Sequence, residues 1–290
     1  MIGYTNGTKK YKFCRFLSYK LGEDHTPCFD AAMEYLRDNP YTTLVIDSGI
    51  YNITRELARE TQRAVMAGEY GDEDIIEILF RPDFPYSRGI NFAGQKGTTV
   101  EAYGVTILVD GYMEPISVRD CDDVTICGLT IDHKRKPYSK AVIKNVGELD
   151  LHGCRRCELE FDPETPIPAS APRCLRASYF DKEIYRNLWC YIAEREVIDE
   201  YHWNALIAKA EKLHDGVEYY TVHTEHFRPA ILIENAKNTI LRDVTIHSQP
   251  GMGIVGHRSE NITLSHLSIV PSVGHHYSTN TDATHFTSIK

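Results

Sequence analysis

Apolar residues recur at fixed offsets in three stretches of the chain: residues 116–132 (ISVRDCDDVTICGLTID), 231–247 (ILIENAKNTILRDVTIH) and 254–270 (IVGHRSENITLSHLSIV). Each stretch predicts a short strand, a polar turn and a second apolar run. The last two copies lie 23 residues apart, and the first precedes the second by 115 residues, a multiple of 23. One strand and turn cannot bury its own apolar face, so units of this length are expected to stack. The pattern predicts a parallel β-helix.

The predicted turns carry short polar side chains at equivalent positions, Asp123, Asn238 and Asn261. Such side chains satisfy backbone groups in tight turns. If the copies stack in register, we expect these residues to form a ladder along one edge.

Residues 24–54 predict a cap at the N-terminal end. Ala31, Ala32, Tyr35 and Leu36 give a short amphipathic helix, and a buried strand and a turn at residues 49–51 follow. A cap is needed because an open end of stacked strands exposes apolar side chains and unpaired backbone. This arrangement resembles the cap of pectate-lyase-like proteins. We therefore expect an all-β fold, a right-handed parallel β-helix with an N-terminal helical cap and a β-rich insertion.

The repeat is interrupted between residues 133 and 226. We predict three regions: the cap and first repeats over 1–132, a β-rich insertion over 133–226, and further repeats over 227–290. A further strand is expected over residues 75–80. Residues 284–290 look like the start of another repeat, so we expect either that the chain is part of a longer protein or that a capping partner covers this end.

Composition narrows the classes of partner. The 290 residues include 42% apolar residues and carry a net charge of −9. A nucleic-acid partner is not expected, because phosphate contacts require a basic surface. No run approaches 18 apolar residues, so no membrane span is predicted. The first residues show no signal peptide.

Polar residues gather in two stretches near the C-terminus, residues 256–261 and 274–285. The second forms a long loop, a frequent position for functional groups. Asp282 lies at its end and would project into a groove. Glycoside hydrolysis needs two carboxyl groups that flank the bond, and Asp282 is a candidate for one. The alternative is that Asn280 and Asp282 only cap a turn.

Histidines 257, 275, 276 and 285 lie in the same stretches, but their spacing matches no regular metal site. Recognition of sugar hydroxyls by His, Arg and Asn explains them without an ion, so we expect neither a metal nor another cofactor. The pair Cys154 and Cys157 indicates two neighbouring thiols. Trp189 and Trp203 could stack on a sugar ring, although we expect core packing for each.

The C-terminal motifs make a family resemblance specific. The runs PGMGIVGHRSENITL (250–264) and STNTDATHF (278–286), with DHKRKP (132–137), resemble glycoside hydrolase family 110. These are bacterial exo-acting α-1,3-galactosidases with a β-helix fold. Asn-Thr-Asp (280–282) also matches polygalacturonases, but Ala283 replaces their glycine.

The resemblance implies inverting hydrolysis of terminal α-linked galactose, with Asp282 as one catalytic carboxylate. In that family the next repeat carries an Asp-Asp pair, and this chain ends at Lys290 before such a pair. We expect the truncated chain alone to be inactive. His257, Arg258, Asn280, Thr281 and His285 are the predicted substrate-binding residues.

The expected partner is an oligosaccharide or polysaccharide with terminal galactose. A non-catalytic carbohydrate-binding or structural protein, and a polygalacturonase-like or lyase enzyme, remain alternatives. A sugar-degrading role favours a periplasmic or extracellular location for the longer protein.

Overall fold

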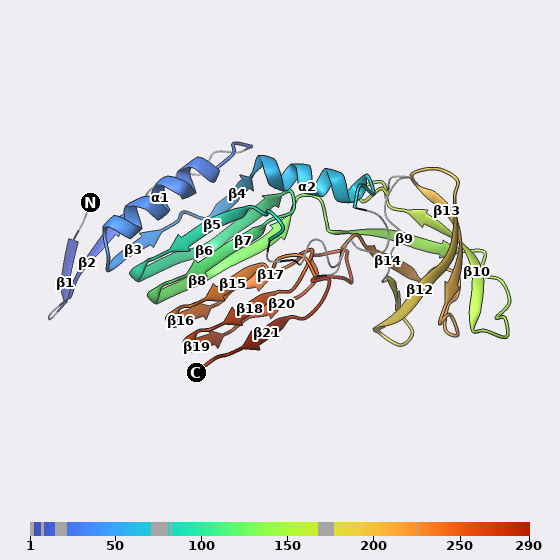
Figure 1. The fold of residues 1–290 in the computed structure, drawn as a ribbon. Helices are drawn as coiled ribbons and strands as arrows, with labels where there is room; N and C mark the ends of the chain where they lie inside the picture. The colour runs from blue at the N-terminus through green and yellow to red at the C-terminus, as the bar shows by residue number, and fades with distance from the viewer. Residues whose placement is uncertain are drawn as a thin grey trace.

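The computed structural model describes residues 3–6, 9–14, 22–70, 81, 83–167, 177–224 and 226–290. In these ranges the chain forms two helices and 21 strands, which confirms the expectation of a β-protein. Figure 1 shows parallel strands over most of the molecule and a separate group of strands at one end. The strand expected over residues 75–80 lies outside the described residues. No helix in the described ranges is long and apolar enough to cross a membrane.

The first sheet has the order β1-β2-β3-β6-β8-β16-β19, with β4 paired to β6, β17 to β8 and β20 to β17. Its strands are parallel except for the antiparallel pair of β1 and β2. The strands are β1 (Gly3–Asn6), β2 (Lys9–Cys14), β3 (Thr42–Val45), β4 (Gly49–Thr54), β6 (Lys96–Asp110), β8 (Asp122–His133), β16 (Lys237–Arg242), β17 (Thr245–Ile246), β19 (Glu260–Ser265) and β20 (Ser268–Ile269).

The second sheet has the order β21-β18-β15-β7-β5 and is parallel throughout. Its strands are β5 (Arg88–Ala93), β7 (Glu114–Arg119), β15 (Ile231–Glu234), β18 (Ile254–His257) and β21 (Thr284–Thr287). Ile116, Ile231 and Ile254 occupy one register position and are fully buried. Ile126, Leu241 and Leu264 likewise occupy one register position in the first sheet, where Ile126 and Leu241 are fully buried and Leu264 is partly buried. The predicted alignment of the three stretches is confirmed.

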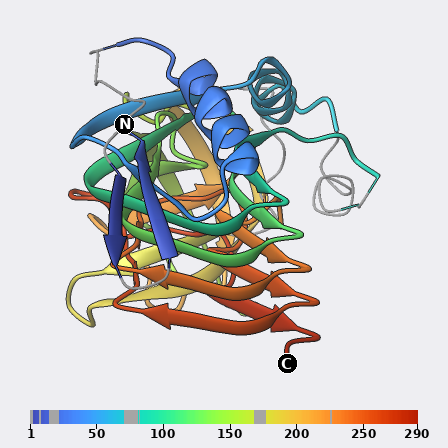
Figure 2. The same ribbon diagram turned by 90° about the vertical axis from the view of Figure 1, so that its left-hand side faces the viewer.

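The two parallel sheets share one apolar core, which helix α1 (Thr26–Asp38) covers at the N-terminal end (Figure 2). Phe29, Ala32, Met33 and Leu36 are buried, and their spacing places them on one helical face. Pro27 stands in the first turn, where its missing N–H is harmless. The predicted N-terminal helix is confirmed. Helix α2 (Glu56–Met66) follows β4 and buries Ala58, Ala64 and Val65.

The remaining strands form a closed antiparallel barrel in the order β10-β13-β12-β11-β14-β9. They are β9 (Tyr138–Lys144), β10 (Cys154–Phe161), β11 (Ala177–Asp181), β12 (Arg186–Val197), β13 (His202–Ala208) and β14 (Glu218–Val222). The barrel has a core of its own, in which Trp203, Phe161 and Tyr219 are almost fully buried. Closure pairs every strand on both sides and leaves no open edge.

The predicted right-handed parallel β-helix is wrong as a description of this fold. The structure combines two parallel sheets with a closed six-stranded antiparallel barrel. The repeats indicated parallel stacking, but they supplied no information on the segment without repeats. Its alternating apolar residues predicted strands and gave no sign that these strands pair with one another into a ring.

The turn residues explain how successive strands keep their register. Asp123, Asn238 and Asn261 have φ values of 60°, 54° and 55°. Asn and Asp tolerate this left-handed conformation better than most residues. Asn261 Nδ2 donates to Asn238 Oδ1 at 3.1 Å, and Asn238 Nδ2 donates to Asp122 Oδ1 at 3.0 Å. The predicted ladder therefore exists, with Asp122 in place of Asp123 as its last acceptor.

Replacing Asn238 should separate two contributions to stability, the side-chain hydrogen bonds of the ladder and the left-handed backbone conformation of the turn. Asn238→Ala loses the side-chain hydrogen bonds and forces a Cβ residue without a polar side chain into the left-handed region. We expect a loss of about 1–2 kcal/mol of unfolding free energy. Asn238→Gly keeps the backbone conformation accessible and should cost less. Urea denaturation of both variants tests this, and an equal loss in both would contradict the role of the backbone conformation.

Candidate functional site

Asp282 lies at the end of the loop that joins β20 to β21. Gly253 N–H donates to Asp282 O at 2.9 Å, and Ile254 N–H donates to Ala283 O at 3.0 Å. A Cβ atom on Gly253 would lie 2.4 Å from Ala283 O. Glycine is therefore required for the loop to approach the start of β18 so closely. The backbone of Asp282 is fixed at the N-terminal ends of β18 and β21.

The side chain of Asp282 is open to solvent and pairs with His285. Its carboxylate is 60% exposed, and Asp282 Oδ2 lies 3.3 Å from His285 Nδ1. The two residues are three positions apart at the start of β21. The structure therefore brings together two of the predicted site residues as an accessible carboxylate and imidazole.

Asn280 anchors the loop. Its side chain is 2% exposed, and Asn280 Nδ2 donates to Thr224 O at 2.6 Å and to Pro137 O at 3.4 Å. Pro137 precedes the first barrel strand and Thr224 follows the last. Asn280 thus links the loop to the points where the chain enters and leaves the barrel. Thr281 is half-buried, and its hydroxyl oxygen is buried without a hydrogen-bond partner.

His257 and Arg258 lie at the other end of β18. His257 Nδ1 is 2.8 Å from Thr287 Oγ1. Arg258 occupies the following turn with a φ of 48°. Gly253, whose N–H bonds to Asp282 O, and Arg258 are five residue steps apart along this strand, which amounts to roughly 16 Å. The predicted residues therefore form two groups at opposite ends of the same strands.

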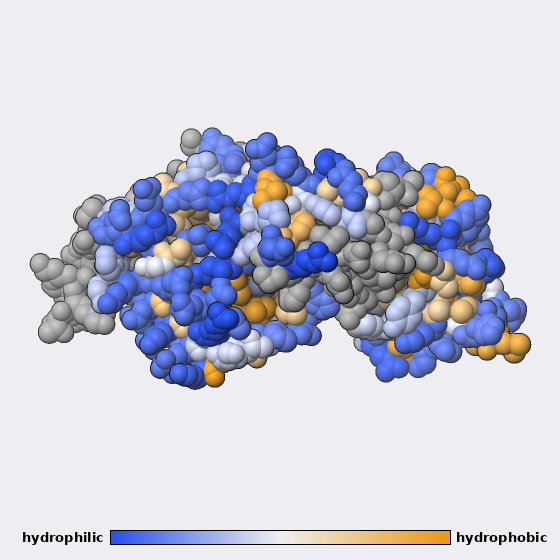
Figure 3. All heavy atoms as spheres, viewed as in Figure 1, coloured by the Kyte–Doolittle hydropathy of each residue, from blue (hydrophilic) through white to orange (hydrophobic). Residues whose placement is uncertain are grey.

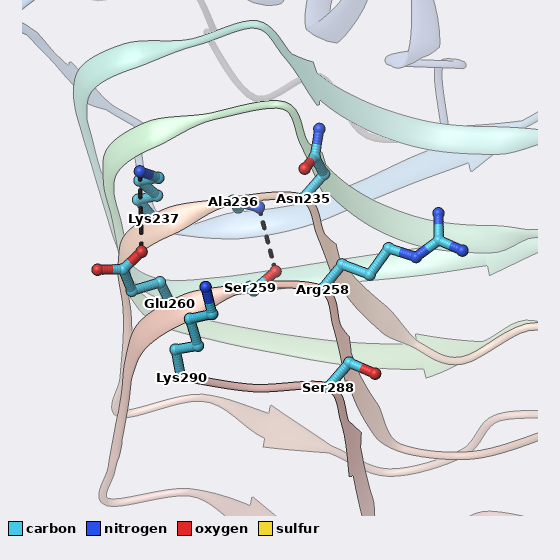
Figure 4. Close-up of a pocket in the computed structure, with 8 residues that line it drawn as sticks. All are labelled: Asn235, Ala236, Lys237, Arg258, Ser259, Glu260, Ser288 and Lys290. Carbon is cyan, nitrogen blue, oxygen red and sulfur yellow. Dashed lines mark hydrogen bonds and ion pairs between the residues drawn. The ribbon is translucent and has the colours of Figure 1, made fainter.

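The Arg258 end contains a hollow of about 390 Å³. Its charged lining is mainly basic and comes from Lys237, Arg258, Glu260 and Lys290. Lys237 Nζ lies 3.7 Å from a Glu260 carboxylate oxygen. Figure 4 shows the Arg258 side chain extended away from this ion pair.

The barrel holds the loop ahead of Asp282 by polar contacts to its backbone. Lys140 Nζ donates to Gly274 O at 3.0 Å, and His276 N–H donates to Tyr220 Oη at 3.0 Å. Asn187 Nδ2 donates to His276 O at 3.2 Å. These donors and acceptors come from β9, β12 and β14. Because they contact main-chain atoms, they fix the path of the loop.

Aromatic rings reinforce the same junction. The rings of Phe180 and His276 are stacked with centroids 3.8 Å apart and planes 8° apart. Tyr277 packs against Tyr138 and Tyr220 at centroid distances of 5.6 and 5.9 Å. Figure 3 shows the surface indented between the parallel sheets and the barrel. The loop is therefore clamped between the two parts of the molecule.

Asp132 is a polar residue at this junction that sequence reasoning noted only for its family resemblance. Its Oδ1 accepts hydrogen bonds from Ser248 Oγ at 2.6 Å, His133 N at 2.8 Å and Lys136 Nζ at 2.5 Å. Burial raises the pKa of Asp132, but the bonds from Lys136 and Ser248 outweigh burial and place the pKa below its usual value. Asp132 is thus ionised and unsuited to proton donation. The spacing of Asp132 and Lys136, four residues, was the available signal.

Three histidines near the junction are kept neutral. Burial lowers the pKa of His133 to about 4, and burial with the charge of Arg135 lowers the pKa of His223 well below its usual value. Burial, together with Lys136 and Lys140, also lowers the pKa of His275. Neutral imidazole can donate one hydrogen bond and accept another. His223 uses both nitrogens, against Ser139 Oγ at 2.9 Å and Tyr112 Oη at 3.3 Å.

One group of side chains in the described part of the chain could hold a metal ion, and it lies in the barrel. Asp181, Glu183 and His214 place one ligand atom each within 4.8 Å of the others. Cys154 and Cys157 are free, buried thiols on β10, and burial raises the pKa of Cys157 to about 12. A thiol in that state is a poor metal ligand at neutral pH.

The two tryptophans differ in environment. Trp203 is 1% exposed and packs edge-to-face on Phe161, with the Arg195 guanidinium 4.6 Å from its ring. The expectation of core packing is confirmed for Trp203. Trp189, on β12, is 54% exposed. For Trp189 that expectation is wrong, because its side chain points out of the barrel.

Comparison with known proteins identifies distant relatives, although no protein-family model matches the chain. Alpha-1,3-galactosidase B of Phocaeicola vulgatus is 26% identical over 227 residues, which cover 72% of this chain and 37% of that protein. Alpha-1,3-galactosidase A of Shewanella woodyi is 20% identical over 291 residues, covering 93% and 45%. Alpha-1,3-galactosidase B of Parabacteroides distasonis is 22% identical over 295 residues, covering 92% and 45%.

The chain spans less than half the length of these curated relatives. It is a distant homologue of proteins named alpha-1,3-galactosidase.

The neutral buried histidines predict a defined acid sensitivity. The pKa of His133 is about 4 in the folded chain and about 6.5 in the unfolded chain. Between these two pH values the unfolded chain binds one more proton at this residue than the folded chain. The contribution of His133 to the free energy of unfolding is therefore fully present above pH 6.5 and is lost as the pH falls towards 4. His133→Gln should reduce this slope by up to about 1.4 kcal/mol per pH unit.

Urea denaturation between pH 4.5 and 7 measures the slope. The exposed His152 provides a matched control, and His152→Gln should leave the slope as it is in the wild type. A wild-type slope in His133→Gln would show that His133 is not held neutral.

Proposed function

We propose that this protein is a glycoside hydrolase that removes terminal α-linked galactose with inversion, and that Asp282 is one of its catalytic carboxylates. The observation that carries this proposal is the solvent-open Asp282 and His285 pair on an otherwise anchored loop. The names of the distant relatives support the substrate class. The inverting reaction and the role of Asp282 are those that the resemblance to glycoside hydrolase family 110 implies.

Asp282 suits the chemistry in position and surroundings. Inverting hydrolysis uses one carboxyl group as acid and another as base, about 6.5–9.5 Å apart, with a sugar and a water molecule between them. The exposed Asp282 carboxylate has room for a substrate on its solvent side. His285 Nδ1 lies 3.3 Å from Asp282 Oδ2, and this contact orients the carboxylate. Asp132 does not suit the role of acid because three donors hold it ionised.

The other predicted residues serve substrate binding in different ways. His257, Arg258 and His285 present exposed or half-exposed polar groups that can bind sugar hydroxyls. Asn280 acts indirectly, because its buried side chain anchors the loop two residues before Asp282. Thr281 is half-buried, and its hydroxyl has no hydrogen-bond partner among the described residues, so it can bind a sugar hydroxyl. His257 and Arg258 at one end of β18, and Asp282 and His285 at the other, would then contact different parts of a saccharide.

Asp282→Asn should strongly reduce hydrolysis and preserve sugar binding. Loss of an acid or base group lowers kcat by about 10²–10⁴-fold. The assay uses p-nitrophenyl α-galactoside and the protein as its gene encodes it in full, with saturation-transfer NMR for galactose binding. Thermal melting should match the wild type, because the Asp282 side chain is mainly exposed.

Asp243 offers a matched control, because it also lies on a turn and its Oδ1 is 3.2 Å from His266 Nδ1. Asp243→Asn should keep full activity. Wild-type turnover in Asp282→Asn would remove Asp282 from the mechanism. Galactose binding without hydrolysis in the wild type would favour a non-catalytic carbohydrate-binding protein.

A further inference from the structure

Trp189 is an unusual residue for the outside of a barrel. Strand β12 alternates, with Leu188, Cys190 and Ile192 directed into the barrel core and Asn187, Trp189 and Tyr191 directed outwards. Trp189 is 54% exposed, whereas tryptophan is buried on average. The indole is therefore not part of the barrel core, and more than half of its surface is open to solvent.

The position of Trp189 relative to the loop carrying Asp282 is defined by its neighbours. Asn187 precedes Trp189 by two residues on the same face and donates to His276 O at 3.2 Å. Phe180, the cross-strand partner of Asn187, stacks on the His276 ring at 3.8 Å. The loop that ends at Asp282 therefore rests on the outer face of β11 and β12, next to Trp189.

The outer face leaves the indole accessible beside that loop. The cross-strand partner of Trp189 on β11 is Ser178, which is small and buried and covers little of a neighbouring ring. Ser178 Oγ is buried without a hydrogen-bond partner. Tyr191 continues the row and is 39% exposed, with Lys209 Nζ 4.7 Å from its ring. The row from Asn187 to Tyr191 is about 13 Å long, longer than one sugar ring.

These features match the way proteins hold neutral sugars. A hexose has an apolar face of C–H groups and an edge of hydroxyls. An indole or phenol ring removes that face from water at a low entropy cost, and neighbouring polar groups take the hydroxyls. Asn187 and Lys209 offer such groups at the two ends of the row.

We propose that Trp189 and Tyr191 form a binding subsite on the barrel for the sugar rings that follow the terminal galactose of an oligosaccharide. The proposal rests on the proposed function, because it takes Asp282 as the site of cleavage. The barrel then contributes to substrate selection, and oligosaccharides bind more tightly than galactose. The saccharide runs from the loop over Asn187 towards Tyr191.

The test follows the two indole N–H signals by NMR in protein with ¹⁵N-labelled tryptophan, assigned with Trp189→Phe. The probes are galactose, the α-1,3-linked galactose disaccharide and a galactose-terminated tetrasaccharide. The Trp189 signal should shift with the tetrasaccharide and stay in place with galactose, while the buried Trp203 signal stays in place with both. Trp189→Ala should weaken tetrasaccharide binding about tenfold, which corresponds to loss of one ring contact.

The matched control is Tyr185, which is 82% exposed at the tip of the same hairpin with a φ of 49°. Tyr185→Asn suits that backbone and should bind the tetrasaccharide as the wild type does. Wild-type affinity in Trp189→Ala, or a Trp189 signal unmoved by bound tetrasaccharide, would overturn the subsite. A Trp189 signal that shifts with protein concentration alone would overturn it in favour of a contact between copies.

The outcomes also separate this proposal from the proposed function. If hydrolysis depends on Asp282 but the Trp189 indole signal does not shift with bound tetrasaccharide, only the subsite is refuted. If the Trp189 signal shifts with the tetrasaccharide but Asp282→Asn keeps full activity, Trp189 binds saccharide and the catalytic assignment of Asp282 is refuted. The subsite would then remain only as a binding site, without a defined position relative to cleavage.

Discussion

Parallel backbone pairing in a fixed register is the constraint on which the structure depends. Ile116, Ile231 and Ile254 stack in one position of the second sheet, and their side chains fill the core between the two sheets. A shift by one residue would turn each of these side chains to the other face. Turn residues with positive φ, such as Asn238 and Asn261, prevent that shift by bonding to one another between successive strands.

The same constraint places the candidate site. Asp282 lies at a strand end because β21 pairs with β18, and Gly253 permits the close approach that the pairing requires. The loop before it would be long and unsupported without the barrel. Polar side chains from β9, β12 and β14 bind its backbone, and Phe180 and Tyr220 pack against its rings. The barrel therefore acts as a support for the residues next to the proposed chemistry.

Sequence reasoning succeeded where a repeat was present and failed where it was absent. The offsets of Ile126, Leu241 and Leu264 gave the correct strand pairing, and the predicted positions Ala32 and Leu36 are buried on one face of helix α1. Closure of the barrel depends on contacts between strands far apart in sequence, for which no periodicity exists. The outward direction of Trp189 could not be foreseen for the same reason. The motif around Asp282 identified a loop, but the distance to Arg258 follows only from the register of β18.

Asn280 connects the position of the barrel to the position of Asp282. Its single amide group holds the carbonyls of Pro137 and Thr224, which mark where the polypeptide passes from the sheets to the barrel and back. Any tilt of the barrel would pull on this amide, two residues from the proposed catalytic acid. A ligand that moves the barrel would therefore move the Asp282 carboxylate as well, so binding at the barrel and reactivity at Asp282 would be mechanically coupled.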